Sequence, residues 1–148
     1  MDKSKEQKDL SEKTIKGLHI LLAEDNELNM EIAEFMFQNE DAEVTKAWNG
    51  LEAVEIFEKS SPGEFDVILM DIMMPVMNGY NATKRIRSMN REDAKTIPII
   101  AMTANAFTED RLKAKEAGMD EHISKPVDGN LLVKNKHILY HMKVYFPQ

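Results

Sequence analysis

The fold of this chain is decided by the stretch FDVILMD, residues 65–71. Its residues up to Met70 are almost uniformly apolar, which is typical of a strand buried on both faces. Such strands belong to parallel sheets that are covered by helices on both sides. Asp71 ends the strand, and the loop at residues 72–79 must turn before any helix can start. A carboxylate at the exposed end of a buried strand is a natural metal ligand or nucleophile.

Short apolar runs alternate with amphipathic stretches on both sides of this strand. The runs predict strands at residues 18–23, 42–47, 65–70, 97–102 and 121–124. The amphipathic stretches predict helices at residues 26–39, 49–59, 78–89 and 108–118, and a last helix from Asp128. In the first of these helices we expect one apolar face made of Leu28, Ile32, Phe35 and Met36. The pattern predicts a doubly wound α/β domain, a flavodoxin-like fold with a five-stranded parallel sheet in the order 2-1-3-4-5.

Composition restricts the class of protein. The chain has 148 residues, 43% of them hydrophobic and 30% charged, which suits one soluble domain. We expect a charged linker or lead-in at residues 1–17, the domain at 18–142 and a tail at 143–148. A net charge of −7 argues against non-specific binding to nucleic acid or an anionic membrane. The absence of cysteine, of a signal peptide and of a long apolar run predicts a cytoplasmic location without membrane contact.

Polar residues stand where four of the predicted strands end. Glu24 and Asp25 follow the first strand, Asp71 the third, Thr103 the fourth and Lys125 the fifth. The carboxyl ends of parallel strands lie along one edge, and ligands bind where the strand order reverses. Three carboxylates and one ammonium carry a net charge of −2, which one divalent cation would neutralise. Mg²⁺ fits this oxygen-rich set and would leave Asp71 free to attack a phosphoryl group.

Four short motifs at these strand ends resemble those of a known family. They are AEDN at residues 23–26, LMDIMMP at 69–75 with Gly79, IAMTA at 100–104, and SKP at 124–126. In this order they resemble the receiver domain of two-component response regulators, and most nearly the receivers of hybrid sensor histidine kinases. Each motif alone is weak, but together they are highly specific. The resemblance runs from about Leu18 to Met142.

The resemblance implies a chemistry for the site. Asp71 would accept a phosphoryl group from a histidine kinase or a histidine phosphotransfer protein. Glu24, Asp25 and the backbone carbonyl of Met73 would hold Mg²⁺ together with Asp71. Lys125 would pair with the phosphoryl group. The residue after this lysine, Pro126, would follow through a cis peptide bond.

The resemblance also implies a switch. Thr103 would close on the phosphoryl group, and the residue at position 122 would follow it inward. Many receivers carry Tyr or Phe there, so His122 leaves open a second interpretation, a half-exposed histidine on an edge strand. Met73 and Asn105 occupy positions that modulate the loss of the acyl phosphate. A homodimer through the helix at 108–118, the strand at 121–124 and the last helix is a further expectation.

Other functions remain to be weighed against the receiver. Glu24 and Asp25 could cap the first helix, and Asp71 could be a solvated loop acid. A metal-dependent phosphohydrolase with an aspartyl nucleophile needs a second carboxylate two residues later, where Met73 stands. A flavin mononucleotide carrier needs a phosphate-binding loop where this chain has acidic residues.

A receiver catalyses its own phosphorylation and dephosphorylation without being a conventional enzyme. The charged first 17 residues favour a segment of a hybrid histidine kinase over a stand-alone receiver.

Overall fold

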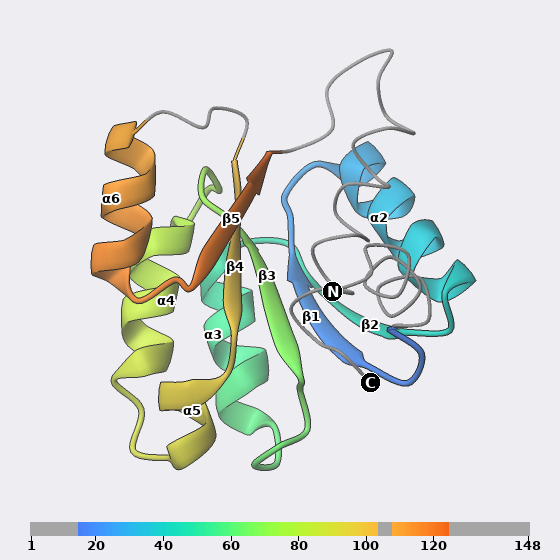
Figure 1. The fold of residues 1–148 in the computed structure, drawn as a ribbon, viewed down its shortest axis with the longest axis horizontal. Helices are drawn as coiled ribbons and strands as arrows, with labels where there is room; N and C mark the ends of the chain where they lie inside the picture. The colour runs from blue at the N-terminus through green and yellow to red at the C-terminus, as the bar shows by residue number, and fades with distance from the viewer. Residues whose placement is uncertain (1–14, 104–107, 125–148) are drawn as a thin grey trace, which may run out of the picture.

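Five short parallel strands form the central sheet of the computed structural model, which describes residues 15–103 and 108–124 (Figure 1). The strands are β1 (His19–Ala23), β2 (Glu43–Ala47), β3 (Val67–Asp71), β4 (Ile99–Thr103) and β5 (Glu121–Ser124). They pair in the order β2-β1-β3-β4-β5, and all four pairings are parallel. The predicted fold class, strand order and strand positions are therefore confirmed.

Helices connect the strands. They are α2 (Glu27–Asn39), α3 (Gly50–Lys59), α4 (Gly79–Arg87), α5 (Glu92–Thr96) and α6 (Thr108–Ala117). The short α5 is absent from the sequence-based expectation, because its five residues contribute only Ala94 to the core and so show no apolar periodicity. The last expected helix, from Asp128, lies outside the described residues. No helix in residues 15–103 and 108–124 is long and apolar enough to cross a membrane.

Asparagine residues define where three of the helices begin. The side chains of Asn26, Asn49 and Asn78 each accept a hydrogen bond from the backbone N–H three residues later. Such caps satisfy N–H groups that have no partner inside the helix. Because α2, α3 and α4 each follow a strand, the three caps lie on the edge of the sheet where the strands end. The predicted helix starts are confirmed at this edge.

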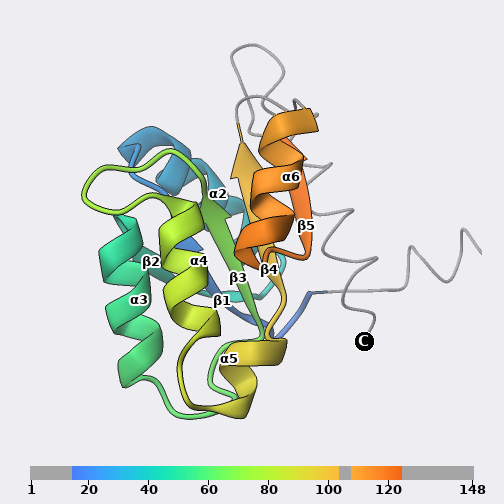
Figure 2. The same cartoon turned by 90° about the vertical axis from the view of Figure 1, so that its left-hand side faces the viewer.

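The sheet is covered on both faces, and each face has its own core (Figures 1 and 2). On one face, Phe57 of α3 and Ile86 of α4 are fully buried. On the other face, Phe37 and Met30 of α2 are buried against β1 and its neighbours. Every residue of β3 is buried, which confirms the interpretation of its apolar run as a central strand.

The apolar face expected for α2 is wrong in part. Leu28 and Phe35 are 62% and 70% exposed, whereas Met36 is buried as expected. The helix packs through Met30, Phe37 and the partly buried Ala33 instead. The helix carries apolar residues along two stripes, and each stripe has the spacing of a helix face. Only the packing of the helix on the sheet decides which stripe is buried.

Arg91 forms several hydrogen bonds at the edge of the sheet where the strands begin. Its guanidinium bonds both carboxylate oxygens of Asp93, at 2.6 and 2.7 Å, and donates to the carbonyls of Phe57 and Ser60, each at 3.0 Å. It also lies 4.5 Å from the centre of the Phe57 ring. These bonds join the end of α3 to the start of α5, at the edge opposite the ends of the strands.

The hydrogen bonds between Arg91 and Asp93 predict that the stability of the fold depends on pH. The hydrogen bonds from Arg91, assisted by the backbone N–H of Gly63, lower the pKa of Asp93 to about 2 from an ordinary 3.8. A lowered pKa means that ionised Asp93 stabilises the fold above pH 3.8 and that this contribution disappears as the pH falls to about 2. We expect Asp93→Asn to lower the free energy of unfolding at pH 7 and to cost progressively less below pH 4.

Urea unfolding of both proteins between pH 2 and pH 7 measures this difference. Glu55→Gln, at an exposed position of α3, is the matched control for losing one carboxylate. A cost of Asp93→Asn that does not change with pH would contradict the role of its charge.

A second prediction concerns Thr83 of α4. It is fully buried, and its hydroxyl has no hydrogen-bond partner within the described part of the chain. An unsatisfied buried hydroxyl costs stability, and valine has the same shape without it. We expect Thr83→Val to raise the free energy of unfolding by about 1 kcal/mol in urea. Thr83→Ser keeps the hydroxyl and removes a methyl group, so it should be less stable than wild type.

Candidate functional site

Three carboxylates meet at the edge of the sheet where the strands end. Glu24 and Asp25 directly follow β1, and Asp71 is the last residue of β3. Because β1 and β3 are neighbours at the reversal of the strand order, one carboxylate oxygen from each residue lies within 4.8 Å of the others. The structure thus brings together the acidic residues that the sequence analysis selected.

The three acids differ in burial. Asp71 is 1% exposed and Glu24 is 3% exposed, whereas Asp25 is exposed. The N–H of Asn26 donates to Oε1 of Glu24 at 3.1 Å, and the N–H of Met73 donates to Oδ1 of Asp71 at 3.2 Å. We call this cluster the acid pocket; two of its carboxylates are buried and one is exposed.

The donor set of the acid pocket fits a hard divalent cation. All three side chains offer oxygen, which Mg²⁺ prefers to nitrogen or sulfur. A cation would also reduce the repulsion among three carboxylates that lie within 4.8 Å of one another. The alternative role of Glu24 and Asp25 as helix caps is not needed, because Asn26 caps α2 by accepting from the N–H of Asn29 at 2.9 Å.

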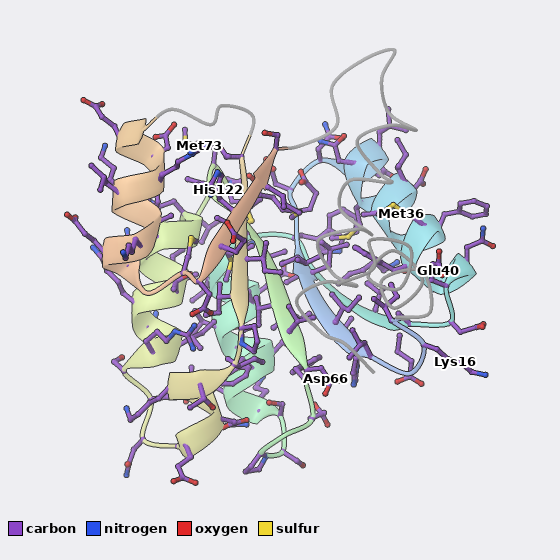
Figure 3. The ribbon with its side chains drawn as sticks, viewed as in Figure 1. Lys16, Met36, Glu40, Asp66, Met73 and His122 are labelled. Atoms are coloured by element: carbon purple, nitrogen blue, oxygen red, sulfur yellow. The ribbon has the colours of Figure 1, made fainter. Side chains whose placement is uncertain are left out.

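The loop at residues 72–78 continues from Asp71 and is tightly turned. The N–H of Gly79 donates to the carbonyl of Ile72 at 2.9 Å, and a Cβ on Gly79 would collide with the carbonyl oxygen of Asp71. Val76 has a φ of 68°, which is rare for a β-branched residue. Met73 lies beyond the end of β3, at the opposite end of the strand from Asp66 (Figure 3), and its side chain is 78% exposed.

Thr103 and His122 come from the two strands on the other side of Asp71. Thr103 ends β4 and is 8% exposed; His122 lies on β5, with its Nδ1 3.5 Å from Oε1 of Glu121. Both residues line one small cavity together with Ile72. Thr103 is therefore close to both the loop after Asp71 and the edge strand, as a switch residue requires.

Three of the expected site residues lie outside the described residues. They are Lys125, Asn105 and Pro126, and their predicted roles remain predictions.

The sequence analysis did not foresee three exposed apolar side chains that follow the acidic residues in the sequence. Leu28, Met73 and Val76 are 62%, 78% and 76% exposed, and they belong to the two segments that follow the acidic residues. Leu28 fits the helical periodicity of residues 26–39 and is therefore expected to be buried, so its exposure cannot be read from the sequence.

Comparisons with known proteins identify related sequences. The profile of the response regulator receiver domain matches residues 20–136. Histidine kinase 1 of Arabidopsis thaliana is 34% identical over 153 residues, an alignment that covers 83% of this chain. The same alignment covers 13% of the kinase, so the chain spans a small part of this relative.

Two solved structures of receiver domains are also similar to this chain. The receiver domain of a sensor histidine kinase from Pseudomonas aeruginosa, described with a magnesium ion coordinated in the active site cleft, is 37% identical with a TM-score of 0.67. That comparison covers 84% of this chain and 98% of the other. The receiver domain of a response regulator from Saccharomyces cerevisiae, crystallised with a histidine phosphotransfer signalling protein, is 29% identical with a TM-score of 0.70. It covers 88% of this chain and 93% of the other.

The acid pocket predicts electrostatic strain in the metal-free protein. Three carboxylates within 4.8 Å repel one another, and this repulsion is weaker in the unfolded chain. We therefore expect Asp25→Asn to melt higher than wild type in chelator at low ionic strength, by about 3 °C for each kcal/mol of repulsion removed. Glu55→Gln removes one negative charge from exposed α3 and should change the melting temperature little. A lower melting temperature for Asp25→Asn would show that Asp25 stabilises the start of α2 instead.

Proposed function

This chain belongs to the response regulator receiver domain family, and from that premise we propose that Asp71 accepts a phosphoryl group from a phosphohistidine donor. The family operates in phosphorelay signalling. The observation that supports Asp71 most directly is its place in the acid pocket, at the end of the central strand and beside Glu24 and Asp25. The turn that follows it is closed by the hydrogen bond from the N–H of Gly79 to the carbonyl of Ile72.

The proposed reaction is a transfer between two side chains. A carboxylate oxygen of Asp71 forms a bond to phosphorus as the bond between phosphorus and the donor's imidazole nitrogen breaks. The imidazole leaves with that electron pair, and the product is an acyl phosphate on Asp71. Positioning and neutralisation of charge account for most of the catalysis in such transfers. The N–H of Met73, 3.2 Å from Oδ1 of Asp71, orients the attacking carboxylate.

We propose Mg²⁺ as the cofactor. Glu24, Asp25, Asp71 and the backbone carbonyl of Met73 would hold it, as the oxygen donors of the acid pocket support. When bound, the ion neutralises negative charge on the phosphoryl oxygens. The magnesium ion described for the related Pseudomonas receiver is consistent with this assignment.

The switch proposal involves the other end of the pocket. Thr103 would donate a hydrogen bond to a phosphoryl oxygen, and Lys125 would pair with its charge. Movement of Thr103 would then change the packing around His122, because both residues line the same small cavity. Phosphorylation would thereby bias an existing equilibrium between two arrangements of the face made by α6, β5 and the last expected helix. Asn105 and Met73 would set how fast the acyl phosphate is lost.

The proposed partner is a histidine kinase or a histidine phosphotransfer protein. The exposed apolar side chains of Leu28, Met73 and Val76, in the segments that directly follow Asp25 and Asp71 in the sequence, would contact the donor. The yeast receiver crystallised with a phosphotransfer protein supports this class of partner. We also propose a cytoplasmic location for the domain. The homodimer expected through α6, β5 and the last helix stays a prediction.

The alternative, a phosphohydrolase with an aspartyl nucleophile, is not favoured. Its general acid would be a second carboxylate two residues after Asp71. Met73 occupies that position and its side chain is 78% exposed. The site therefore has the nucleophile of such an enzyme without the proton donor.

Acetyl phosphate provides a direct test of the phosphoacceptor. We expect wild type to gain the mass of one phosphoryl group in intact-mass spectra when Mg²⁺ is present and none in chelator. Asp71→Asn should gain none under either condition, because an amide is a poor nucleophile. Asp66→Asn, at the opposite end of β3, is the matched control and should react like wild type. Equal uptake by Asp71→Asn and wild type would assign the reaction to another residue.

A further inference from the structure

We infer that Gly50, the first residue of α3, is a positioning residue for the loop that follows Asp71. It offers no side chain to the acid pocket and belongs to a different strand–helix unit. The inference rests on the proposed function, because its consequence is measured at Asp71. The contacts that carry it are steric and involve backbone atoms only.

Gly50 and the loop are in direct contact. The N–H of Gly50 donates to the carbonyl of Met77 at 3.0 Å. A Cβ on Gly50 would collide with that carbonyl oxygen and lie 2.9 Å from its carbon and 3.0 Å from the carbonyl oxygen of Asn78. Backbone atoms cannot rotate away as the end of a side chain can, so any larger residue must displace the loop or the helix.

Backbone conformation does not account for the glycine. The glycines with positive φ among the described residues are Gly17, Gly63 and Gly118. Gly50 is thus in a conformation open to any residue, and alanine is preferred to glycine in a helix by about 0.5–1 kcal/mol. The close approach of the loop is the remaining physical reason for a glycine here.

The loop is held at both ends, so a displacement at Met77 reaches Asp71. The N–H of Gly79, directly after the loop, donates to the carbonyl of Ile72 at the start of the loop at 2.9 Å, and a Cβ on Gly79 would collide with the carbonyl of Asp71. Inside the loop, the N–H of Met77 donates to the carbonyl of Pro75 at 2.7 Å. Figure 2 shows the loop between β3 and α4 passing over the upper end of α3.

A displacement of the loop would move Met73. This residue donates its N–H to Asp71 and would supply its carbonyl to the cation. A loop pushed outward by a Cβ at position 50 would move both groups relative to the acid pocket. Groups that orient a metal ligand typically change metal affinity or activity by about 10–100-fold when they are altered.

Gly50→Ala and Gly17→Ala form a matched pair. Gly17 precedes β1 with a φ of 82°, and a Cβ there would have no atom within 4 Å. Gly17→Ala should therefore lose stability through backbone strain while leaving the loop in place. Both substitutions are made in wild type and in the Thr83→Val background, whose added stability offsets the cost.

Three measurements test the inference. Amide NMR shifts of the metal-free protein should change at residues 72–78 in Gly50→Ala and not in Gly17→Ala. The Mg²⁺ dissociation constant from calorimetry should rise about tenfold in Gly50→Ala alone. Phosphorylation by acetyl phosphate at saturating Mg²⁺ should slow in the same variant alone.

The outcomes separate this inference from the proposed function. Unchanged shifts and Mg²⁺ affinity in Gly50→Ala overturn the inference, even if Asp71 is phosphorylated. Failure of Gly50→Ala to fold in both backgrounds, while Gly17→Ala folds, also overturns it and makes Gly50 a requirement of the fold. A wild-type protein that takes up no phosphoryl group refutes the proposed function, whatever the glycine variants do.

Discussion

The burial of Asp71 at the end of β3 is the constraint on which the rest of the site depends. A carboxylate that is 1% exposed must be compensated. The N–H of Met73 contributes one hydrogen bond, but Glu24 and Asp25 add negative charge within 4.8 Å. The mutual repulsion of these carboxylates would be reduced by a bound cation.

The geometry around Asp71 is maintained mainly by backbone contacts. Asparagine caps start α2, α3 and α4 at the edge where the strands end. Gly50 and Gly79 have no Cβ, and this allows the loop at residues 72–78 to lie against α3 and β3. Backbone contacts vary less than side-chain rotamers, so the carboxylates occupy defined positions before any ligand arrives. Preorganisation of this kind lowers the cost of reaching the transition state.

Stability and chemistry are concentrated at opposite edges of the sheet. At the edge where the strands begin, Arg91 joins α3 to α5 through Asp93. Arg87 of α4 likewise donates to the carbonyls of Gly118 and Ala94 and pairs with Asp120 at 2.9 Å. The acid pocket lies at the other edge, where the strands end.

The sequence by itself determined the strands, the starts of α2, α3 and α4 and the three acids, because apolar period and capping chemistry are local properties. The strand order came from the resemblance to receiver domains and from the rules for parallel sheets. The sequence could not decide which apolar stripe of α2 would be buried: Met30 and Phe37 pack on the sheet, whereas Leu28 and Phe35 face solvent. Nor could it show that Gly50 supports the loop after Asp71, since that contact joins segments from different strand–helix units. Only the tertiary structure decides such contacts, because they depend on how helices dock and how closely two backbones approach.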